Sequence, residues 1–499
     1  MEPRSLSVPS PELAADSLGF FRWGRIAGRV LVTTDAGDWA YLSEAEFGDL
    51  LAARVTAGHP RFEEFQRMGL VRDGLDLDAL ATRIAQRNRH VARGPHVHVV
   101  TLSRRAAAAE ASANAGDDLD VATAEAIVDL ALQVTAPAIT FELQAADGEP
   151  LRHFDVLRHL VETAVTRNAR ATGKDLRFRL ISNCSAMTEA TAEWLIGRDV
   201  LLTTTLDGPA YLHDATRRWL PGSPHADVVG WIDYFTRRYA ELGRDPQQWH
   251  VDALCNVTRQ TLGARRALLD EYVARGLRML HLRPLAAARV DAETWRTIGY
   301  GLEEYLDFYR HALDDIVALN RRGVDLRESL ATIILTKILT ADDPGIVDLQ
   351  SPYGAGTGQI AYDVDGQVYP CDEARAVAAA GDPLFALGQA QAVKIADLVQ
   401  HPTVRAIATA SLLDVQPMCA ECWNKPYCGF SPVRSYIAQG DLFGQRPHCA
   451  ECKEHLAIST RLFELLGDEQ DPETVAVLTR WPSVRSPHAT NGRAYRDAP

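Results

Sequence analysis

The chain has 499 residues, which is enough for roughly two to four domains with a sizeable core. Its net charge is −14, from 52 Lys and Arg against 66 Asp and Glu, so it lacks the excess positive charge that nucleic-acid binding needs. No apolar run approaches the ~20 residues of a membrane helix, and the polar segment Met1–Ser17 is no secretory signal. We therefore expect a cytoplasmic protein without nucleic-acid or membrane partners.

The first part of the chain predicts a small α+β domain followed by a helical connector. Val30–Thr34 and Trp39–Leu42 are rich in β-forming residues and flank an Asp-Ala-Gly-Asp turn, which predicts a hairpin. A capping box that begins at Ser43 opens a helix, and a second short helix is expected at Phe62–Leu70. The polar segment Asp73–Arg93 has a helical pattern and indicates a connector.

From residue 96 onward, strands alternate with helices six times, which predicts a parallel sheet closed or partly closed into a barrel. The expected strands are Val97–Leu102, Ala138–Leu143, Leu176–Ile181, Val200–Thr205, His250–Val257 and Met279–Leu285. The expected helices are Val121–Gln133, Phe154–Ala169, Glu189–Gly197, Ala226–Leu242, Ala264–Gly276 and one long helix at Thr294–Asn320. Active sites of such sheets lie at the C-terminal ends of the strands.

After about residue 340 the chain becomes rich in Gly, Pro and Asp, and Asp365-Gly366 predicts a hairpin within Gln359–Tyr369. The last segment is polar and indicates a mobile tail. These patterns divide the chain into an N-terminal α+β domain with its connector, a (β/α)6 barrel, a cysteine-rich domain and a tail. The expected boundaries are 1–95, 96–340, 341–465 and 466–499.

Five of the eight cysteines fall within 34 residues: Cys419, Cys422, Cys428, Cys449 and Cys452. In a cytosolic chain such a cluster is more typical of a metal site than of disulfides. Thiolates at this spacing can converge on a zinc ion or on an iron–sulfur cluster. Two Cys-x2-Cys pairs alone would suit zinc, and the extra Cys428 favours a cluster. Zinc and unliganded cysteines stay as alternatives.

Polar residues follow four of the predicted strands, where the site of a barrel would lie. Taken singly, Asn, Asp, Gly and Pro are common at strand ends, but their occurrence in order along the barrel suggests a binding site. The candidate cofactor-binding residues are Gly148, Glu149, Asn183, Asp207 and Arg283. No catalytic residue can be named from the sequence, because the histidines form no spaced set and no phosphate loop is present.

These features together resemble a radical S-adenosylmethionine (SAM) enzyme with a C-terminal SPASM domain, over about residues 96–465. More narrowly, they resemble the B-type maturase of the His-Xaa-Ser peptide-modification system. The supporting stretches are Phe141-Glu142-Leu143, Gly148-Glu149-Pro150-Leu151, Leu206-Asp207-Gly208-Pro209, Leu282-Arg283-Pro284-Leu285, Asp365-Gly366-Gln367-Val368-Tyr369, Cys371-Asp372-Glu373-Ala374-Arg375 and Pro426-Tyr427-Cys428-Gly429. The resemblance implies a partial (β/α)6 barrel, a [4Fe–4S] cluster that cleaves SAM, a peptide substrate, and auxiliary clusters in the SPASM domain.

The chain departs from this family at the radical-generating site. The family carries Cys-x3-Cys-x2-Cys after the first strand, but here Ser103-Arg104-Arg105 follows Leu102 and no cysteine precedes Cys184. Asp147 stands where the family's Gly-Gly-Glu-Pro motif has its first glycine, and would crowd the cofactor. We therefore expect no radical-generating cluster, and SAM binding stays open because the iron that anchors it has no ligands.

The SPASM region is altered selectively. The first auxiliary cluster lacks the cysteines that the family has near Tyr353 and Pro432, which leaves Cys371 without partners. The second cluster keeps Cys419, Cys422 and Cys428, with Cys452 or Cys449 as the fourth ligand. The resemblance therefore implies a single [4Fe–4S] cluster, with zinc as the alternative.

The sequence thus favours a degenerate maturase that binds a peptide substrate or leader peptide and acts as a partner or regulator of an active radical SAM protein. An active radical SAM peptide-modifying oxidoreductase and a zinc-stabilised, non-enzymatic binding protein are the alternatives. The N-terminal hairpin and helix resemble leader-peptide recognition domains, in which an edge strand binds an extended peptide. A plain accessory domain is an equally good interpretation of that segment.

Overall fold

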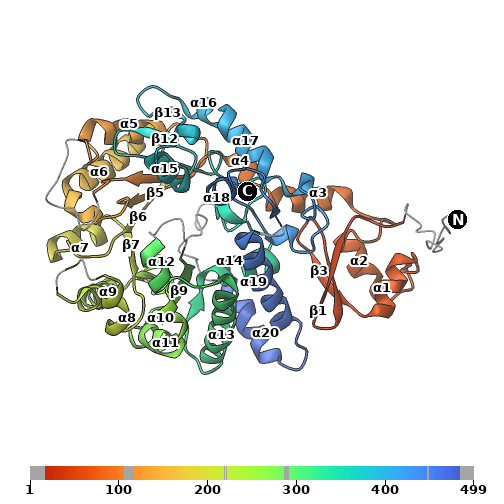
Figure 1. Ribbon diagram of the computed structural model, residues 1–499. Helices are drawn as coiled ribbons and strands as arrows, with labels where there is room; N and C mark the ends of the chain where they lie inside the picture. The colour runs from red at the N-terminus through yellow and green to blue at the C-terminus, as the bar shows by residue number, and fades with distance from the viewer. Residues whose placement is uncertain are drawn as a thin grey trace, which may run out of the picture.

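Two sheets organise the computed structural model, one small and antiparallel, one large and mostly parallel (Figure 1). The small sheet belongs to the N-terminal segment, and the large one carries the barrel and continues into the C-terminal region. The structure describes residues 17–105, 116–217, 220, 222–285, 292–446 and 449–483.

The N-terminal unit is a three-stranded sheet followed by helices. Its strands are β1 (Arg22–Ile26), β2 (Arg29–Thr33) and β3 (Trp39–Leu42), paired antiparallel in the order β1-β2-β3. Its helices are α1 (Glu44–Leu51), α2 (Phe62–Met68), α3 (Leu77–Arg87) and α4 (His90–Arg93). The predicted hairpin and the capping box at Ser43 are confirmed. Strand β1 was not predicted, because its two arginines and its glycine hide the apolar alternation.

Both faces of the N-terminal sheet are buried. One face, with Val30 and Val32, packs against α1 and α2. On the other face Leu31 belongs to the main core of the molecule, and the Tyr41 hydroxyl donates to the carbonyl of Phe463 over 2.8 Å. Phe463 lies in α19 (Ala450–Leu466), so the first and last parts of the chain are neighbours (Figure 1).

The six predicted βα units are present. Their strands are β4 (Val97–Thr101), β5 (Ala138–Gln144), β6 (Asp175–Ile181), β7 (Val200–Thr205), β8 (Asp252–Val257) and β9 (Met279–Pro284). Each pairs in parallel with the next, so their C-terminal ends meet at one edge of the sheet. The main helices are α5 (Val121–Ala131), α6 (Phe154–Ala171), α7 (Glu189–Gly197), α9 (Pro224–Glu241), α11 (Arg265–Ala274) and α13 (Leu302–Arg321).

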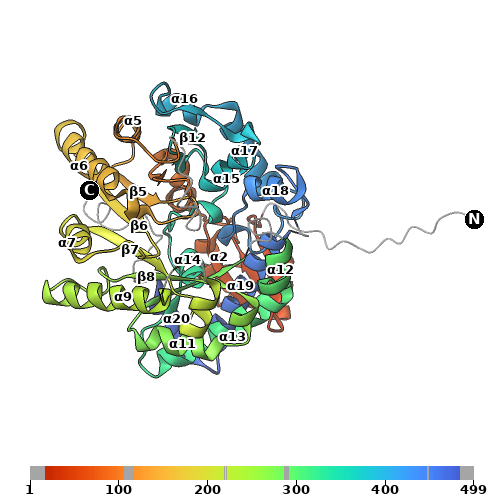
Figure 2. The ribbon, with the colours of Figure 1, turned by 60° about the vertical axis from the view of Figure 1, so that its left-hand side comes forward.

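The helices of the βα units cover the outer face of this sheet, as Figure 2 shows for α6, α7 and α9. Short helices lie in the connections: α8 (Ala210–Thr216), α10 (Arg259–Leu262) and α12 (Ala292–Ile298). The single long helix expected at Thr294–Asn320 is wrong. It divides into α12 and α13 between Gly299 and Gly301, and Gly301 caps α13 in an extended conformation. No helix in the described ranges combines the length and the apolar character needed to cross a bilayer.

The C-terminal region continues the barrel sheet. Two-residue strand β10 (Arg327–Glu328) joins one edge, followed by α14 (Ser329–Leu339). At the other edge β11 (Gln359–Tyr362) pairs in parallel with β4, followed by β12 (Gln367–Tyr369) and β13 (Gly388–Gln389). The predicted hairpin at Asp365-Gly366 is therefore confirmed. The remaining helices are α15 (Asp372–Ala379), α16 (Ile395–Val399), α17 (Pro402–Ser411), α18 (Pro432–Gln439), α19 and α20 (Pro472–Arg480).

The expected tail begins later than its polarity suggests. Helix α20 buries Val477 and Leu478, and Trp481 is only 1 % exposed, with its indole nitrogen donating to Asn320 over 3.1 Å. A few apolar residues at helical spacing are enough to dock a polar segment. The interpretation of residues 472–483 as a mobile tail is therefore wrong, and residues 484–499 lie outside the described ranges.

Replacing Phe463 by Ala is expected to lower the free energy of unfolding by about 3–5 kcal/mol. The Phe463 ring is fully buried and packs edge-on against Trp39 and Trp423, with centroid distances of 5.3 and 5.5 Å. Urea unfolding would measure the change. Phe443→Ala, at a ring that is 47 % exposed, is the matched control and should cost less than about 1 kcal/mol. Equal losses in the two variants would contradict the prediction.

Candidate functional site

The predicted strand-end residues lie along the C-terminal edge of the barrel sheet. Gly148 and Glu149 follow β5, Asn183 follows β6, Asp207 follows β7, and Arg283 lies near the end of β9. Glu149 and Asn183 are in contact with each other. The contacts of Asp207 lead to β8 and α8, and Arg283 of β9 pairs in register with Asn256 of β8, whose amide donates to Asp207.

The Glu149 carboxylate is buried and makes three hydrogen bonds. Oε1 accepts from the Leu151 amide (2.9 Å) and the Ser182 hydroxyl (2.8 Å), and Oε2 accepts from the Asn183 amide (2.9 Å). Burial raises its pKa above the ordinary value for Glu. The side chain of Asn183 turns back to accept from the Ser185 amide. These hydrogen bonds tie the loop after β5 to the end of β6.

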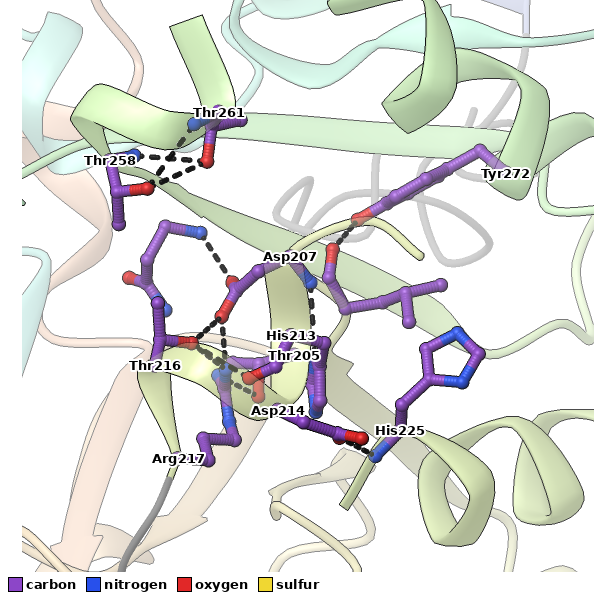
Figure 3. A network of polar contacts seen from close by, with 12 residues as sticks. Thr205, Asp207, His213, Asp214, Thr216, Arg217, His225, Thr258, Thr261 and Tyr272 are labelled. Carbon is purple, nitrogen blue, oxygen red and sulfur yellow. Dashed lines mark hydrogen bonds and ion pairs between the residues drawn. The ribbon is translucent and has the colours of Figure 1, made fainter. Parts of the chain in front are cut away.

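Asp207 is the centre of a second buried network (Figure 3). Its Oδ2 accepts from the Arg217 guanidinium and from the Thr216 hydroxyl, the latter over 3.1 Å. Its Oδ1 accepts from the Asn256 amide at 2.9 Å, and its own amide donates to Nδ1 of His213 at 3.2 Å. Arg217 is about one-tenth exposed and Asp207 less, so this is a buried ion pair that joins the ends of β7 and β8 to α8.

Arg283 also interacts with a second group of charged residues. It lowers the pKa of His281 together with Arg434, although burial is the larger cause and brings that pKa to about 4. Arg434, on α18, pairs with Asp348 (3.0 Å), Glu373 (3.1 Å) and Glu451 (3.5 Å). This cluster could not be predicted from local sequence patterns, because its members come from four separate segments.

The loop after β4 is held by ion pairs in the place where the family has its cysteines. Nε of Arg104 donates to Asp363 (2.9 Å) and Nη2 to Asp365 (2.8 Å), both in the β11–β12 hairpin. Ser103 donates to Asp118 over 2.7 Å, and Arg105 pairs with the same carboxylate. The described part of the loop is therefore fixed by charge, and residues 106–115 lie outside the described ranges.

The five clustered cysteines form one neighbourhood. Cys449 is the N-cap of α19, and its Sγ accepts from the amide of Cys452 at 3.3 Å. The pKa of Cys449 is lowered to about 6, first by the hydrogen bond from Cys452 and then by Arg446. Cys428 and Cys419 also interact electrostatically with Cys452 and help to raise the pKa of its thiol. Within the described ranges, however, no three His, Cys, Asp or Glu side chains are close enough together to hold a single metal ion.

The surroundings of Arg446 show whether these cysteines are suited to binding a metal ion or a cluster. Its side chain is 3 % exposed and donates from Nη2 to the Ala410 carbonyl, but Nε and Nη1 have no hydrogen-bond partner. Burial lowers its pKa to about 10, while Cys419 and Cys449 are its nearest counter-charges. A buried guanidinium without an anion is costly. Metal-bound thiolates would supply the missing charge, so the residues fit a thiolate-ligated group.

Basic groups also surround Cys428. Nδ1 of the buried His455 lies 3.6 Å from its Sγ, and the buried Lys337 lies within electrostatic reach. Burial raises the pKa of the Cys428 thiol, so without a metal this sulfur stays protonated. The sequence analysis missed His455, whose signal is the i, i+3, i+6 spacing of Cys449, Cys452 and His455 along α19.

The other cysteines are packed in cores. Cys371, Tyr353 and Val433 belong to one buried hydrophobic cluster, which fills the place expected for a first auxiliary cluster. Cys184 and Cys255 are buried in the barrel core. Sγ of Cys184 lies 3.6 Å from the hydroxyl of Thr204.

Comparison with known proteins finds solved structures with a similar fold. No family model and no curated protein matches the chain. Among solved structures, anSMEcpe with bound AdoMet has a TM-score of 0.60 at 16 % identity, over 78 % of this chain and 100 % of that one. anSMEcpe with bound AdoMet and Cp18Cys peptide has 0.59 at 16 %, over 77 % and 99 %. Streptococcus suis SuiB bound to S-adenosylmethionine has 0.49 at 14 %, over 86 % and 98 %.

At this identity the likeness is one of fold. It confirms the fold expected from the sequence, a partial (β/α)6 barrel. A small N-terminal α+β unit precedes the barrel, and a cysteine-rich region follows it.

Asp207→Asn is expected to lower the free energy of unfolding by about 3–5 kcal/mol, because it leaves the buried Arg217 without its counter-charge. Chemical unfolding of the purified chain would measure the loss. Asp307→Asn, whose side chain is 74 % exposed on α13, is the control and should change stability by less than about 1 kcal/mol. A stable Asp207→Asn protein would mean that the network does not support the fold.

Cys422→Ser is expected to leave less than about half of the metal that the wild-type chain binds after reconstitution, because a soft ligand is lost. Metal analysis of the folded fraction measures this. Cys184→Ser is the matched control and should keep its full metal content, because Cys184 lies in the barrel core. Full metal in Cys422→Ser protein, or loss in Cys184→Ser protein, would show that the ligands were assigned to the wrong cysteines.

Proposed function

We propose that the chain is a degenerate member of the radical SAM/SPASM peptide maturases, of the His-Xaa-Ser type. It binds a peptide substrate or leader peptide and acts as a partner or regulator of an active radical SAM protein. It keeps one [4Fe–4S] cluster at Cys419, Cys422, Cys428 and Cys452, with Cys449 as the alternative fourth ligand. It has no radical-generating cluster of its own.

The observation that carries this proposal is the loop after β4. Arg104 bridges this loop to the β11–β12 hairpin through Asp363 and Asp365, and Arg105 is paired with Asp118. A loop that bound three irons would need thiols at these positions, and it offers guanidinium groups instead. The loss is supported a second time at Glu149, whose carboxylate already accepts hydrogen bonds from Leu151, Ser182 and Asn183.

Iron–sulfur chemistry is favoured over zinc by the number of thiols and by the resemblance to the SPASM domain. Two Cys-x2-Cys pairs, Cys419 with Cys422 and Cys449 with Cys452, would be enough for a zinc ion. Cys428 is the additional thiol, and the resemblance implies that it ligates an auxiliary cluster. The unpartnered nitrogens of Arg446 support a site that carries net negative charge, as a thiolate-ligated cluster does.

Peptide binding is supported by the N-terminal unit and by one similar structure. The order β1-β2-β3 makes β1 and β3 the edge strands, and an extended peptide adds to such an edge through backbone hydrogen bonds. The structure of anSMEcpe with Cp18Cys peptide pairs this fold with a bound peptide. A pull-down with this chain from the native host would identify the peptide and the partner protein.

Anaerobic reconstitution with iron and sulfide is the test. We expect about four irons per chain and no reductive cleavage of SAM, because the segment between β4 and α5 has no cysteine to hold the cluster that would cleave it. About eight irons or more, with 5′-deoxyadenosine formed, would establish an active radical enzyme. Zinc without iron would establish a zinc-stabilised binding protein. Either result would overturn the proposal.

A further inference from the structure

The segment between Cys419 and Cys428 lies against the N-terminal sheet. The Arg22 guanidinium donates to the carbonyl of Ala420 over 2.5 Å, and the Thr33 hydroxyl donates to the carbonyl of Trp423 over 2.8 Å. The Tyr427 hydroxyl donates to the carbonyl of Gly37 over 3.1 Å. Each contact joins parts of the chain almost 400 residues apart.

Charge adds to these hydrogen bonds. Asp35 accepts from Arg22 and from Lys425, each over 2.9 Å, so one carboxylate links the sheet to the cysteine segment. The side chains of Arg22 and Lys425 are almost fully buried. Arg87 of α3 donates to the carbonyl of Pro426 over 2.8 Å and is itself buried. The three basic side chains of the interface are therefore desolvated, while the Asp35 side chain is 37 % exposed. The buried donors lose their hydrogen bonds if the two surfaces separate.

Packing is close at Gly24 of β1. A Cβ built on this glycine would lie 2.4 Å from Cδ1 of Trp423, so the indole rests directly on the backbone of the strand. Trp423 packs edge-on against Phe463 at 5.5 Å on its other side. The indole is thus held between the N-terminal sheet and α19.

The segment has little structure of its own. Between Cys419 and Cys428 it contains one 3₁₀ turn, Lys425–Tyr427, and its other backbone hydrogen bonds are short turns, from the Cys422 amide to the Cys419 carbonyl and from the Lys425 amide to the Cys422 carbonyl. No long helix or strand fixes its shape, so the groups that hold its ends and its side contribute to that shape. When the thiols bind a metal, they fix the two ends of the segment. The N-terminal sheet contacts the segment along its length. A ligand that orders a segment favours whatever else binds that ordered form, and the effect is reciprocal.

We propose that metal binding at the cysteine site and docking of the N-terminal unit are coupled through residues 420–427. The loaded site holds this segment in the shape on which β1 and β2 dock. Loss of the metal frees the segment and loosens the N-terminal unit. The inference rests on the proposed metal site. It makes the position of the peptide-recognition unit depend on the state of the cysteine site.

Hydrogen–deuterium exchange of the full chain gives the first test. The chain reconstituted with iron and sulfide is compared with the same chain stripped by a chelator under reducing conditions. Peptides covering 22–42 should exchange at least about fivefold faster after stripping, while peptides from α6, far from the interface, should not change. Unchanged exchange over 22–42 in a chain that demonstrably bound iron overturns the coupling alone. A chain that binds no metal overturns both this inference and the proposed cluster.

Two variants test the reciprocal effect. Gly24→Ala pushes a methyl group into Trp423, and Thr33→Val removes the hydrogen bond to the Trp423 carbonyl. Each should release iron to a chelator at least about fivefold faster than the wild-type chain. Gly48→Ala is the matched control, because a methyl group there meets no atom within 4 Å, and its release rate should equal that of wild type. Wild-type release in both folded test variants overturns the proposal.

Discussion

The parallel pairing of β4 with β5 on one side and β11 on the other is the constraint on which the rest depends. Val99 lies opposite Glu142 in β5 and opposite Ala361 in β11, and β4 is buried along its whole length. This pairing makes the C-terminal region part of the barrel sheet. It also sets the loop after β4 beside the β11–β12 hairpin, which is why Arg104 can reach both of the hairpin's carboxylates.

Two polar sites in this molecule differ in the charge of the groups that lack partners. At the strand ends, the carboxylates of Glu149 and Asp207 accept hydrogen bonds from within the chain, and the unpartnered atom beside Asp207 is Nε2 of His213, whose pKa is lowered by burial. At the cysteine site, two buried nitrogens of the Arg446 guanidinium lack hydrogen-bond partners. Since a buried charge needs a counter-charge, the cysteine site is the one that points to an anionic group.

The sequence predicted those features that depend on local pattern. The six βα units, the hairpins and the Ser43 capping box follow from periodicity and turn chemistry over a few residues. Strand β1 was missed because its face is completed by Trp423, about 400 residues away, rather than by its own alternation. The break before α13 was missed because two glycines in one helical pattern are a weak signal.

The candidate site could likewise be predicted only where its residues form a local pattern in the sequence. The cysteines could be found from their spacing, since ligands that share a short segment show themselves in the sequence. Arg446, His455 and the Arg434 cluster could not, because tertiary packing alone brings them to the thiols or to one another. The ion pairs of Arg104 could not be predicted either. The sequence showed only that the residues beside Arg104 are not cysteines.

The contacts between the first sheet and the last helices have a consequence for synthesis of the chain. The face of β1–β3 that Phe463 and Trp423 cover is not completed until the ribosome has made some 400 further residues. At about 5–20 residues per second, roughly 20 to 80 s pass before Trp423 and Phe463 can cover it. Chaperones that shield exposed apolar surface therefore have a defined place and a defined interval in which to act on this protein.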